Sequence, residues 1–292
     1  MLAHPVTPKA QAPGRDPAPI LAAAREALGG EKRLSGVKNF VATGRTRQVR
    51  GDNLVPIEFE IAVELPDKYV RKDEIPAQES GPTSTGFNGD ELIQLPVPTP
   101  PGAPPAGAAG RTGGPPATPS PAMLDAARIA RVATVKQDFV RLTLGMFAAS
   151  FSSYPLTFTY AGQAEAPQGK ADVLEAKAPP NFSVQLFIDS QTHLPLMVSW
   201  KQAPGRAGGR GRGDGPPPEG RGRGDAPAAE GRGAPPAPVE YRIYYADYRE
   251  VDGLQWPFRL RRATGPDTTE ETIFDRFKIN TKIDPKKFEV RK

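Results

Sequence analysis

The sequence predicts a mainly β protein with helices (an α+β fold), in which about eleven antiparallel strands form a sheet covered by two helices. Three observations predict this fold class. Apolar and polar residues alternate over most of the chain, tight-turn sequences separate the alternating segments, and one long segment has the apolar spacing of an amphipathic helix. Alternation gives a strand one dry and one wet face, which is typical of antiparallel sheets.

The alternation is clearest in residues 57–65, where every second side chain is apolar and the intervening positions include glutamates. Pro66-Asp67 then turns the chain into a strand over 68–75. Further segments with the same pattern are 83–87, 91–95, 182–189, 194–200, 239–245, 254–260 and 270–279. Asn88-Gly89 and Asp252-Gly253 are strong hairpin-turn sequences, because both central residues of such turns adopt positive φ.

Two segments predict helices. Residues 20–28 form a short helix that ends at Gly29-Gly30, since glycine adopts the left-handed C-cap conformation without steric cost. Residues 122–147 form a long amphipathic helix. Its apolar residues are Val132, Val135, Phe139, Leu142 and Met146. Its expected polar side holds Arg128, Arg131, Lys136, Asp138 and Arg141.

Three stretches differ in composition from the rest of the chain, namely 1–19, 96–121 and 203–238. Together they hold 23 of the 35 prolines and none of the 22 aromatic residues. Such segments cannot bury enough apolar area to offset their ordering entropy. We expect a disordered tail or signal-peptide remnant over 1–19, and a single domain over 20–292 with disordered insertions at 96–121 and 203–238.

Several functional classes are disfavoured. No apolar run is long enough for a transmembrane helix, the chain has no cysteine, and it has two histidines, His4 and His193. The P-loop, the dinucleotide fingerprint and the zinc-protease and nucleophile-elbow motifs are all missing. The carboxylate pairs Glu58/Glu60 and Glu270/Glu271 fall on or beside wet strand faces, where solvated charge is expected. We therefore expect no enzyme activity, no cofactor and no metal.

The net charge of +5 is partly due to the insertion at 203–238, which repeats GRGRGD at 209–214 and 220–225. Arginine binds phosphate oxygens, so weak contact with an anionic membrane surface is possible in principle. No aromatic residues are interleaved and four acids dilute the charge, so nucleic-acid binding is not expected.

Short motifs along the chain resemble those of the outer-membrane lipoprotein carrier and sorting proteins (LolA/LolB-like), a family of bacterial envelope proteins. The motifs are LPDKY at 65–69, FNGD at 87–90, DSQTHLP at 189–195, YREVDGLQWP at 248–257 and F-x-I-N-x-x-I-D-x-x-x-F at 277–288. The resemblance implies a half-open, strongly curved antiparallel sheet, an incomplete barrel closed by helices over an apolar cavity. It also implies export to the periplasm or the periplasmic face of the outer membrane. Ala10-Gln11-Ala12 has the form of a signal-peptidase site, so we expect a signal peptide upstream or truncated.

The resemblance implies that the concave face binds a lipid, a lipoprotein acyl chain or another hydrophobic ligand. The well-studied carriers have an arginine before the proline that ends the amphipathic strand, whereas this chain has Leu65. That difference favours binding of a hydrophobic ligand in general over lipoprotein trafficking as such, by a protein that we expect to be a monomer. The candidate cavity residues are Ile57, Phe59, Ile61, Val63, Phe139, Leu142, Phe182, Val184, Leu186, Trp256 and Phe258. The alternative is a non-catalytic interaction or structural module of the envelope, in which these residues form a dry core filled by helix 122–147.

Overall fold

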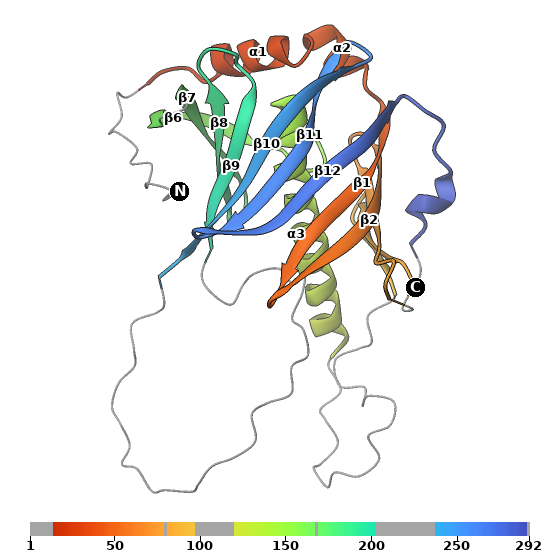
Figure 1. The fold of residues 1–292 in the computed structure, drawn as a ribbon. Coiled ribbons are helices and arrows are strands. Elements are labelled where there is room, and N and C mark those ends of the chain that lie inside the picture. The colour runs from red at the N-terminus through yellow and green to blue at the C-terminus, as the bar shows by residue number, and fades with distance from the viewer. Residues whose placement is uncertain (1–13, 79–80, 97–119, 167–168, 203–236, 291–292) are drawn as a thin grey trace, which may run out of the picture.

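The computed structural model describes residues 14–78, 81–96, 120–166, 169–202 and 237–290. Within them it has three α-helices, one 3₁₀ helix and twelve strands (Figure 1). The helices are α1 (Ala18–Ala27), α2 (Glu31–Gly36), α3 (Pro121–Phe147) and η1 (Pro285–Phe288). The strands are β1 (Asn39–Arg50), β2 (Asn53–Glu64), β3 (Lys68–Glu74), β4 (Thr83–Asn88), β5 (Glu91–Leu95), β6 (Thr157–Ala166), β7 (Gly169–Ala178), β8 (Phe182–Asp189), β9 (Pro195–Gln202), β10 (Val239–Val251), β11 (Leu254–Thr264) and β12 (Asp267–Ile279).

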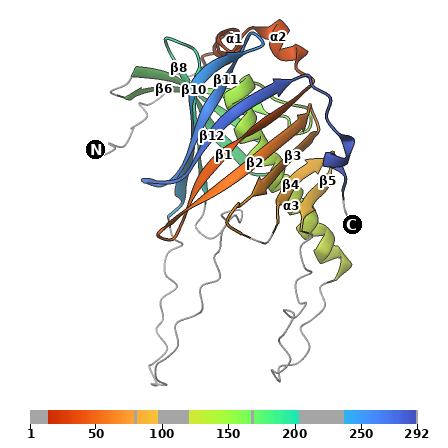
Figure 2. The ribbon, with the colours of Figure 1, turned by 45° about the vertical axis from the view of Figure 1, so that its right-hand side comes forward.

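The strands form one antiparallel sheet in the order β5-β4-β3-β2-β1-β12-β11-β10-β9-β8-β7-β6. The sheet is not closed into a barrel, because β5 and β6 are its two edges in the part of the chain that the structure describes. It curves around α3, which crosses the concave face, while α1 and α2 lie across one end (Figures 1 and 2). The predicted fold class is confirmed, with one strand more than the expected eleven.

The predicted turns have the expected backbone. Asp252 and Gly253 connect β10 to β11 with φ of 53° and 75°, which is the left-handed geometry of a tight hairpin. Asp189 begins the turn between β8 and β9 by accepting hydrogen bonds from the amides of Gln191 and Thr192 at 2.9 and 2.7 Å. Turn chemistry read from the sequence therefore fixes which strands are neighbours.

Helix α3 begins where the sequence predicts, with Ser120 as its N-cap: the Ser120 hydroxyl accepts a hydrogen bond from the amide of Met123 at 3.3 Å. All five residues of its predicted apolar stripe are buried against the sheet. The predicted polar side is wrong at two positions, since Lys136 and Arg141 are also buried. Both are long side chains whose methylene stems pack on apolar surface while the charged ends reach a partner. Helix α2 was not predicted from the sequence.

The C-terminal segment covers part of the convex face. Ile283 and Phe288, just before and within η1, pack on Ala62, Val70 and Ile93 of strands β2, β3 and β5. The larger core lies on the concave side, between the sheet and the helices. The functional question therefore concerns how fully the helices fill that concave face.

We expect Gly145→Ala to destabilise the protein, because α3 approaches β10 most closely there. A Cβ at Gly145 would lie 2.2 Å from Cε1 of the buried Tyr245 ring. Overpacking of this kind costs about 1–3 kcal/mol, which exceeds the gain of about 1 kcal/mol from the better helix propensity of alanine. Urea unfolding should report the loss.

Gly36→Ala in α2 is the matched control, because a Cβ there meets nothing within 4 Å and the stability should be unchanged or slightly higher. Equal stability of Gly145→Ala and the wild type would contradict the packing described here.

Candidate functional site

All eleven residues predicted as cavity residues are buried, nine on the sheet and two, Phe139 and Leu142, on α3. Ten belong to one continuous core, whereas Ile57 lies apart from it, toward the end of the sheet away from α1 and α2. That these residues contact a ligand stays a prediction. In the structure these residues pack against one another and against α3.

Aromatic contacts fill the middle of the concave face. The Phe139 ring of α3 lies with its centroid 5.3 Å from that of Tyr69 and 5.4 Å from that of Phe87. Farther along the face, the Trp256 ring lies 4.8 Å from Phe277 and 5.6 Å from Phe147, the last residue of α3. Ring pairs at these distances are in van der Waals contact, so this part of the face is a solid core.

A cavity of about 450 Å³ remains at the end of the sheet where α3 stops. Helices α1 and α2, the β2–β3 corner, the C-terminal turn of α3 and strand β6 surround it. Its apolar walls are Leu21, Leu34, Val37, Leu65, Pro66, Phe147, Ala148, Ala149, Phe151 and Phe158, and its polar lining is Arg25, Ser35, Lys38 and Ser150. The volume lies in the range of small-molecule sites, and the pocket, which opens to solvent, has a lining of apolar side chains mixed with polar groups.

This cavity exists because α3 ends before it reaches α1 and α2. Ala148, the C-cap of α3, has a left-handed backbone with φ of 45°, and its amide donates to the carbonyl of Leu144 at 3.1 Å. The chain then turns away through Ser150, whose hydroxyl accepts a hydrogen bond from the amide of Leu156 at 2.7 Å. The helix does not continue across the gap, so the space between α1, α2 and the end of α3 stays open.

The two cations of this cavity come from α1 and from the segment between α2 and β1. Arg25 lies in the last turn of α1, where its Nη2 donates to Glu31 at 2.7 Å, while its buried Nε has no hydrogen-bond partner. Lys38 is exposed, and its Nζ lies 3.4 Å from the carbonyl oxygen of Ser35. None of the residues that line the cavity is acidic. The lining therefore combines apolar side chains with two cations and no acid.

A second, polar cavity of about 280 Å³ lies at the opposite end of the concave face and includes Ile57, Arg71, Asp73 and Glu270. The Arg71 guanidinium stacks 4.5 Å from the Phe59 ring centroid and donates through Nε to Asp73 at 2.6 Å. Burial opposes the charge of Arg71, but Asp73 and Glu270 outweigh it and raise the pKa of Arg71 above its ordinary value. This arginine is held as a charged, paired group.

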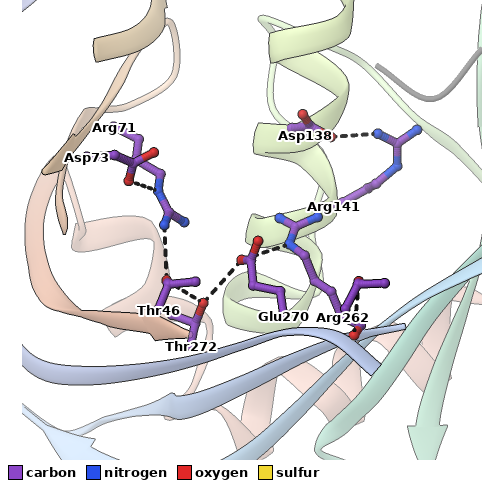
Figure 3. Close-up of polar contacts among 9 residues, drawn as sticks. Thr46, Arg71, Asp73, Asp138, Arg141, Arg262, Glu270 and Thr272 are labelled. Atoms are coloured by element: carbon purple, nitrogen blue, oxygen red, sulfur yellow. Dashed lines mark hydrogen bonds and ion pairs between the residues drawn. The ribbon is translucent and has the colours of Figure 1, made fainter. Parts of the chain in front are cut away.

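The same polar cluster continues across the sheet (Figure 3). Arg71 donates to the Thr46 hydroxyl at 3.1 Å, Thr46 and Thr272 share a hydrogen bond of 2.8 Å, and Thr272 donates to Glu270 at 3.3 Å. Arg262 pairs with Glu270 at 3.5 Å. The expectation that Glu270 is a solvated surface carboxylate is wrong, because its side chain is only 13 % exposed. Its charge is compensated within the protein.

Arg141 on α3 belongs to the packing of the helix. Its guanidinium lies over the rings of Trp200 and Phe182, at 4.3 and 5.2 Å from their centroids, and donates to Asp138 at 2.9 Å. Burial lowers the pKa of Arg141, and the nearby charge of Arg262 lowers it further. Two tyrosines of β10 bind the helix backbone: Tyr245 donates to the carbonyl of Arg141, and the Tyr248 hydroxyl lies 2.9 Å from that of Gly145.

Two further observations bear on the kind of site. Among the residues that the structure describes, no group of three or more metal-ligating side chains is placed to hold a metal ion. No described helix is long and apolar enough to cross a membrane. Together with the cavities, the arrangement defines a class: an unclosed antiparallel sheet wrapped around a helix, with a cavity lined by apolar and basic side chains at one end and a neutral polar one at the other.

One solved structure shares this architecture, and a second is reported as a weaker similarity. A LolA-superfamily protein of Nitrosomonas europaea is 12% identical, with a TM-score of 0.52, and the match covers 94% of this chain and 98% of that one. An outer-membrane lipoprotein-sorting domain of Vibrio parahaemolyticus is 9% identical, with a TM-score of 0.47, covering 92% of this chain and 95% of that one. The sequence matches no protein-family model. It also matches no curated protein. The likeness to the Nitrosomonas protein confirms, at the level of the fold, the resemblance drawn from the motifs.

Sequence reasoning missed the cavity at the end of α3. Its walls come from segments separated by more than a hundred residues, and no periodic pattern marks their junction. One signal was available. The LPDKY motif drew attention to Leu65, and Leu65 with Pro66 forms part of the cavity wall.

We expect Phe139→Ala to lower the free energy of unfolding by about 3–5 kcal/mol, because removing a ring from a packed core leaves a void. Phe139 is 1% exposed and contacts three other rings. Urea denaturation measures the loss. Ile129→Ala, on the same helix but 68% exposed, is the control and should change stability by less than about 0.5 kcal/mol. A cost near that of the control would instead indicate that Phe139 borders an open ligand space.

Proposed function

We propose that this chain is a non-catalytic protein of the bacterial cell envelope, located in the periplasm, that binds an acyl chain or another hydrophobic ligand. The observation that carries the proposal is the apolar cavity between α1, α2, the end of α3 and the β2–β3 corner. The LolA-superfamily fold supports the choice of compartment and ligand class. Under this proposal the residues that line the α3-end cavity contact the ligand. Of the eleven residues predicted from the sequence, ten form the core beside that cavity, and Ile57 lies at the other end of the sheet.

The size of the cavity suits a single chain. An engineered cavity of about 150 Å³ holds one benzene ring, so 450 Å³ has room for about eighteen carbon atoms. Burying each methylene contributes about 0.8 kcal/mol, which makes a long chain a favourable occupant even after the cost of immobilising it. The cavity does not require the solid core around Phe139 and Trp256 to open.

The absence of an arginine before Pro66 concerns whether a bound ligand is retained or passed on. Leu65 presents an apolar side chain to the cavity at this corner. We propose retention or buffering of a hydrophobic molecule in preference to hand-over of lipoproteins. The Arg/Gly repeats at 209–214 and 220–225 lie outside the described residues, and weak contact with an anionic membrane surface remains a prediction for them.

A second candidate function rests on a specific observation, the burial of the middle of the concave face under α3. A sheet filled by its own helix needs no ligand, and the protein would then be an interaction or structural module of the envelope. The two candidates differ in whether the cavity at the end of α3 is occupied.

We expect the wild-type chain to bind one molecule of an eighteen-carbon fluorescent fatty acid, and Leu21→Trp to weaken that binding about tenfold or more by filling the cavity. Fluorescence titration measures the affinity. Ala22→Trp is the matched control, because Ala22 is the next residue of α1, is exposed and does not line the cavity. If the wild type takes up no fatty acid at all, the structural-module function is the correct one.

A further inference from the structure

We propose that the cavity at the end of α3 selects acyl ligands with an anionic head group, a carboxylate or a phosphate, which Arg25 and Lys38 recognise. The inference rests on the proposed function and specifies its ligand class. Arg25 and Lys38 line a space that is otherwise built from apolar walls, two serines and backbone. A chain buried among the leucines and phenylalanines would place its head group at these two cations.

Arg25 has an unused donor. Its Nη2 donates a hydrogen bond to Glu31, whereas its Nε is buried and has no acceptor. A buried donor without a partner is costly. Nε is closed to solvent in the structure, so a ligand oxygen accepts from it only after the side chain turns; the rest of the Arg25 side chain, 28% exposed, is accessible directly. Glu31 is 65% exposed, so solvent weakens the ion pair between Glu31 and Arg25. Positive charge therefore remains beside the cavity.

Lys38 adds a movable charge. Its ammonium contacts only the carbonyl of Ser35 among the described residues, at the long distance of 3.4 Å, so it is free to turn toward a head group. At the β2–β3 corner, Glu64 is paired with Lys68 at 2.9 Å. No ion pair joins Lys38 to a carboxylate among the described residues, so its charge is available to a head group. Charge-assisted hydrogen bonds from such groups to oxyanions are about twice as strong as neutral ones.

In the polar cavity at the other end of the sheet, by contrast, the charged groups are paired with one another. There Arg71 pairs with Asp73 and Arg262 pairs with Glu270, and hydroxyls of two threonines complete the network. An anion would have to displace those carboxylates. At the end of α3 it would only have to accept from donors that have no acceptor or a distant one. Anion recognition therefore favours the α3-end cavity.

The test compares head groups on one chain length, using the full-length protein at pH 8, where a carboxylate is ionised. Titration calorimetry is run with palmitate, with the phosphate-headed single-chain lipid palmitoyl-lysophosphatidic acid and with hexadecanol, each below its micelle concentration. We expect both anions to bind about tenfold more tightly than the alcohol. The stronger of the two anions identifies the carboxylate or the phosphate as the preferred head group.

The variants Arg25→Gln and Lys38→Gln, singly and together, should remove this preference while leaving hexadecanol binding unchanged. Arg25→Lys should keep part of it, because the charge remains but the Nε donor is lost. Lys32→Gln is the matched control, since Lys32 is exposed on α2 and does not line the cavity. Thermal unfolding of each variant verifies that it folds.

Two results would overturn the inference while leaving the proposed function intact. One is equal affinity of the wild type for palmitate and hexadecanol. The other is a preference for anions that Lys32→Gln reduces as much as Arg25→Gln does, because the effect would then be the general positive field of the protein. Absence of binding for all three ligands would instead overturn the proposed function itself.

Discussion

The structure depends on one constraint: an antiparallel sheet that does not close must have its concave apolar face covered from within. Helix α3 meets that constraint with its C-terminal half, from Val132 to Phe147, while its first turns project past the sheet (Figure 2). Each large apolar side chain buried this way contributes about 1.5–3 kcal/mol. The helix is held in place by Tyr245 and Tyr248, whose hydroxyls bind its backbone carbonyls, and by the close approach at Gly145. Apolar area supplies most of the stability, and these polar contacts fix the position of the helix along the sheet.

The same helix determines where a ligand fits. Because α3 ends at Phe147, the concave face is filled up to that ring and open beyond it, where α1 and α2 cross the end of the sheet. Phe147 therefore belongs to two environments: it packs on Phe40 and Trp256 in the core, and it forms a wall of the cavity. A ligand in the cavity would touch the last turn of the helix that closes the core. Binding and packing of α3 are expected to be coupled for this reason, with ligand stabilising the folded chain by an amount that rises with the logarithm of its free concentration above Kd.

Much of this fold follows from the sequence, because its signals are local. Period-two alternation marks the dry face of the strands, and turn residues such as Asp252-Gly253 determine which strands are neighbours. The extent of α3 is predictable from its apolar spacing to within one residue, whereas its capping by Ser120 was not predicted. Two of its charged residues could not be assigned correctly, because Lys136 pairs with Asp90 of the β4–β5 turn and Arg141 stacks on Trp200 of β9, both far from α3 in the sequence. Tertiary partners of this kind leave no trace in the spacing of a single helix.

The cavity could not be predicted for a related reason. A dry strand face looks the same in sequence whether a helix or a ligand covers it, so alternation identified Phe59, Phe182 and Trp256 as apolar but could not show that they are packed. The position of the open space depends on where three helices end, and its charge comes from Arg25, which pairs with the exposed Glu31 through Nη2 only, and from Lys38. Nothing in the sequence distinguishes Arg71 from Arg25. In the structure the charge of Arg71 is compensated by Asp73, whereas Arg25 has a buried Nε without an acceptor. The difference between a structural arginine and one available to a ligand lies in hydrogen-bond satisfaction, which is a property of the folded chain alone.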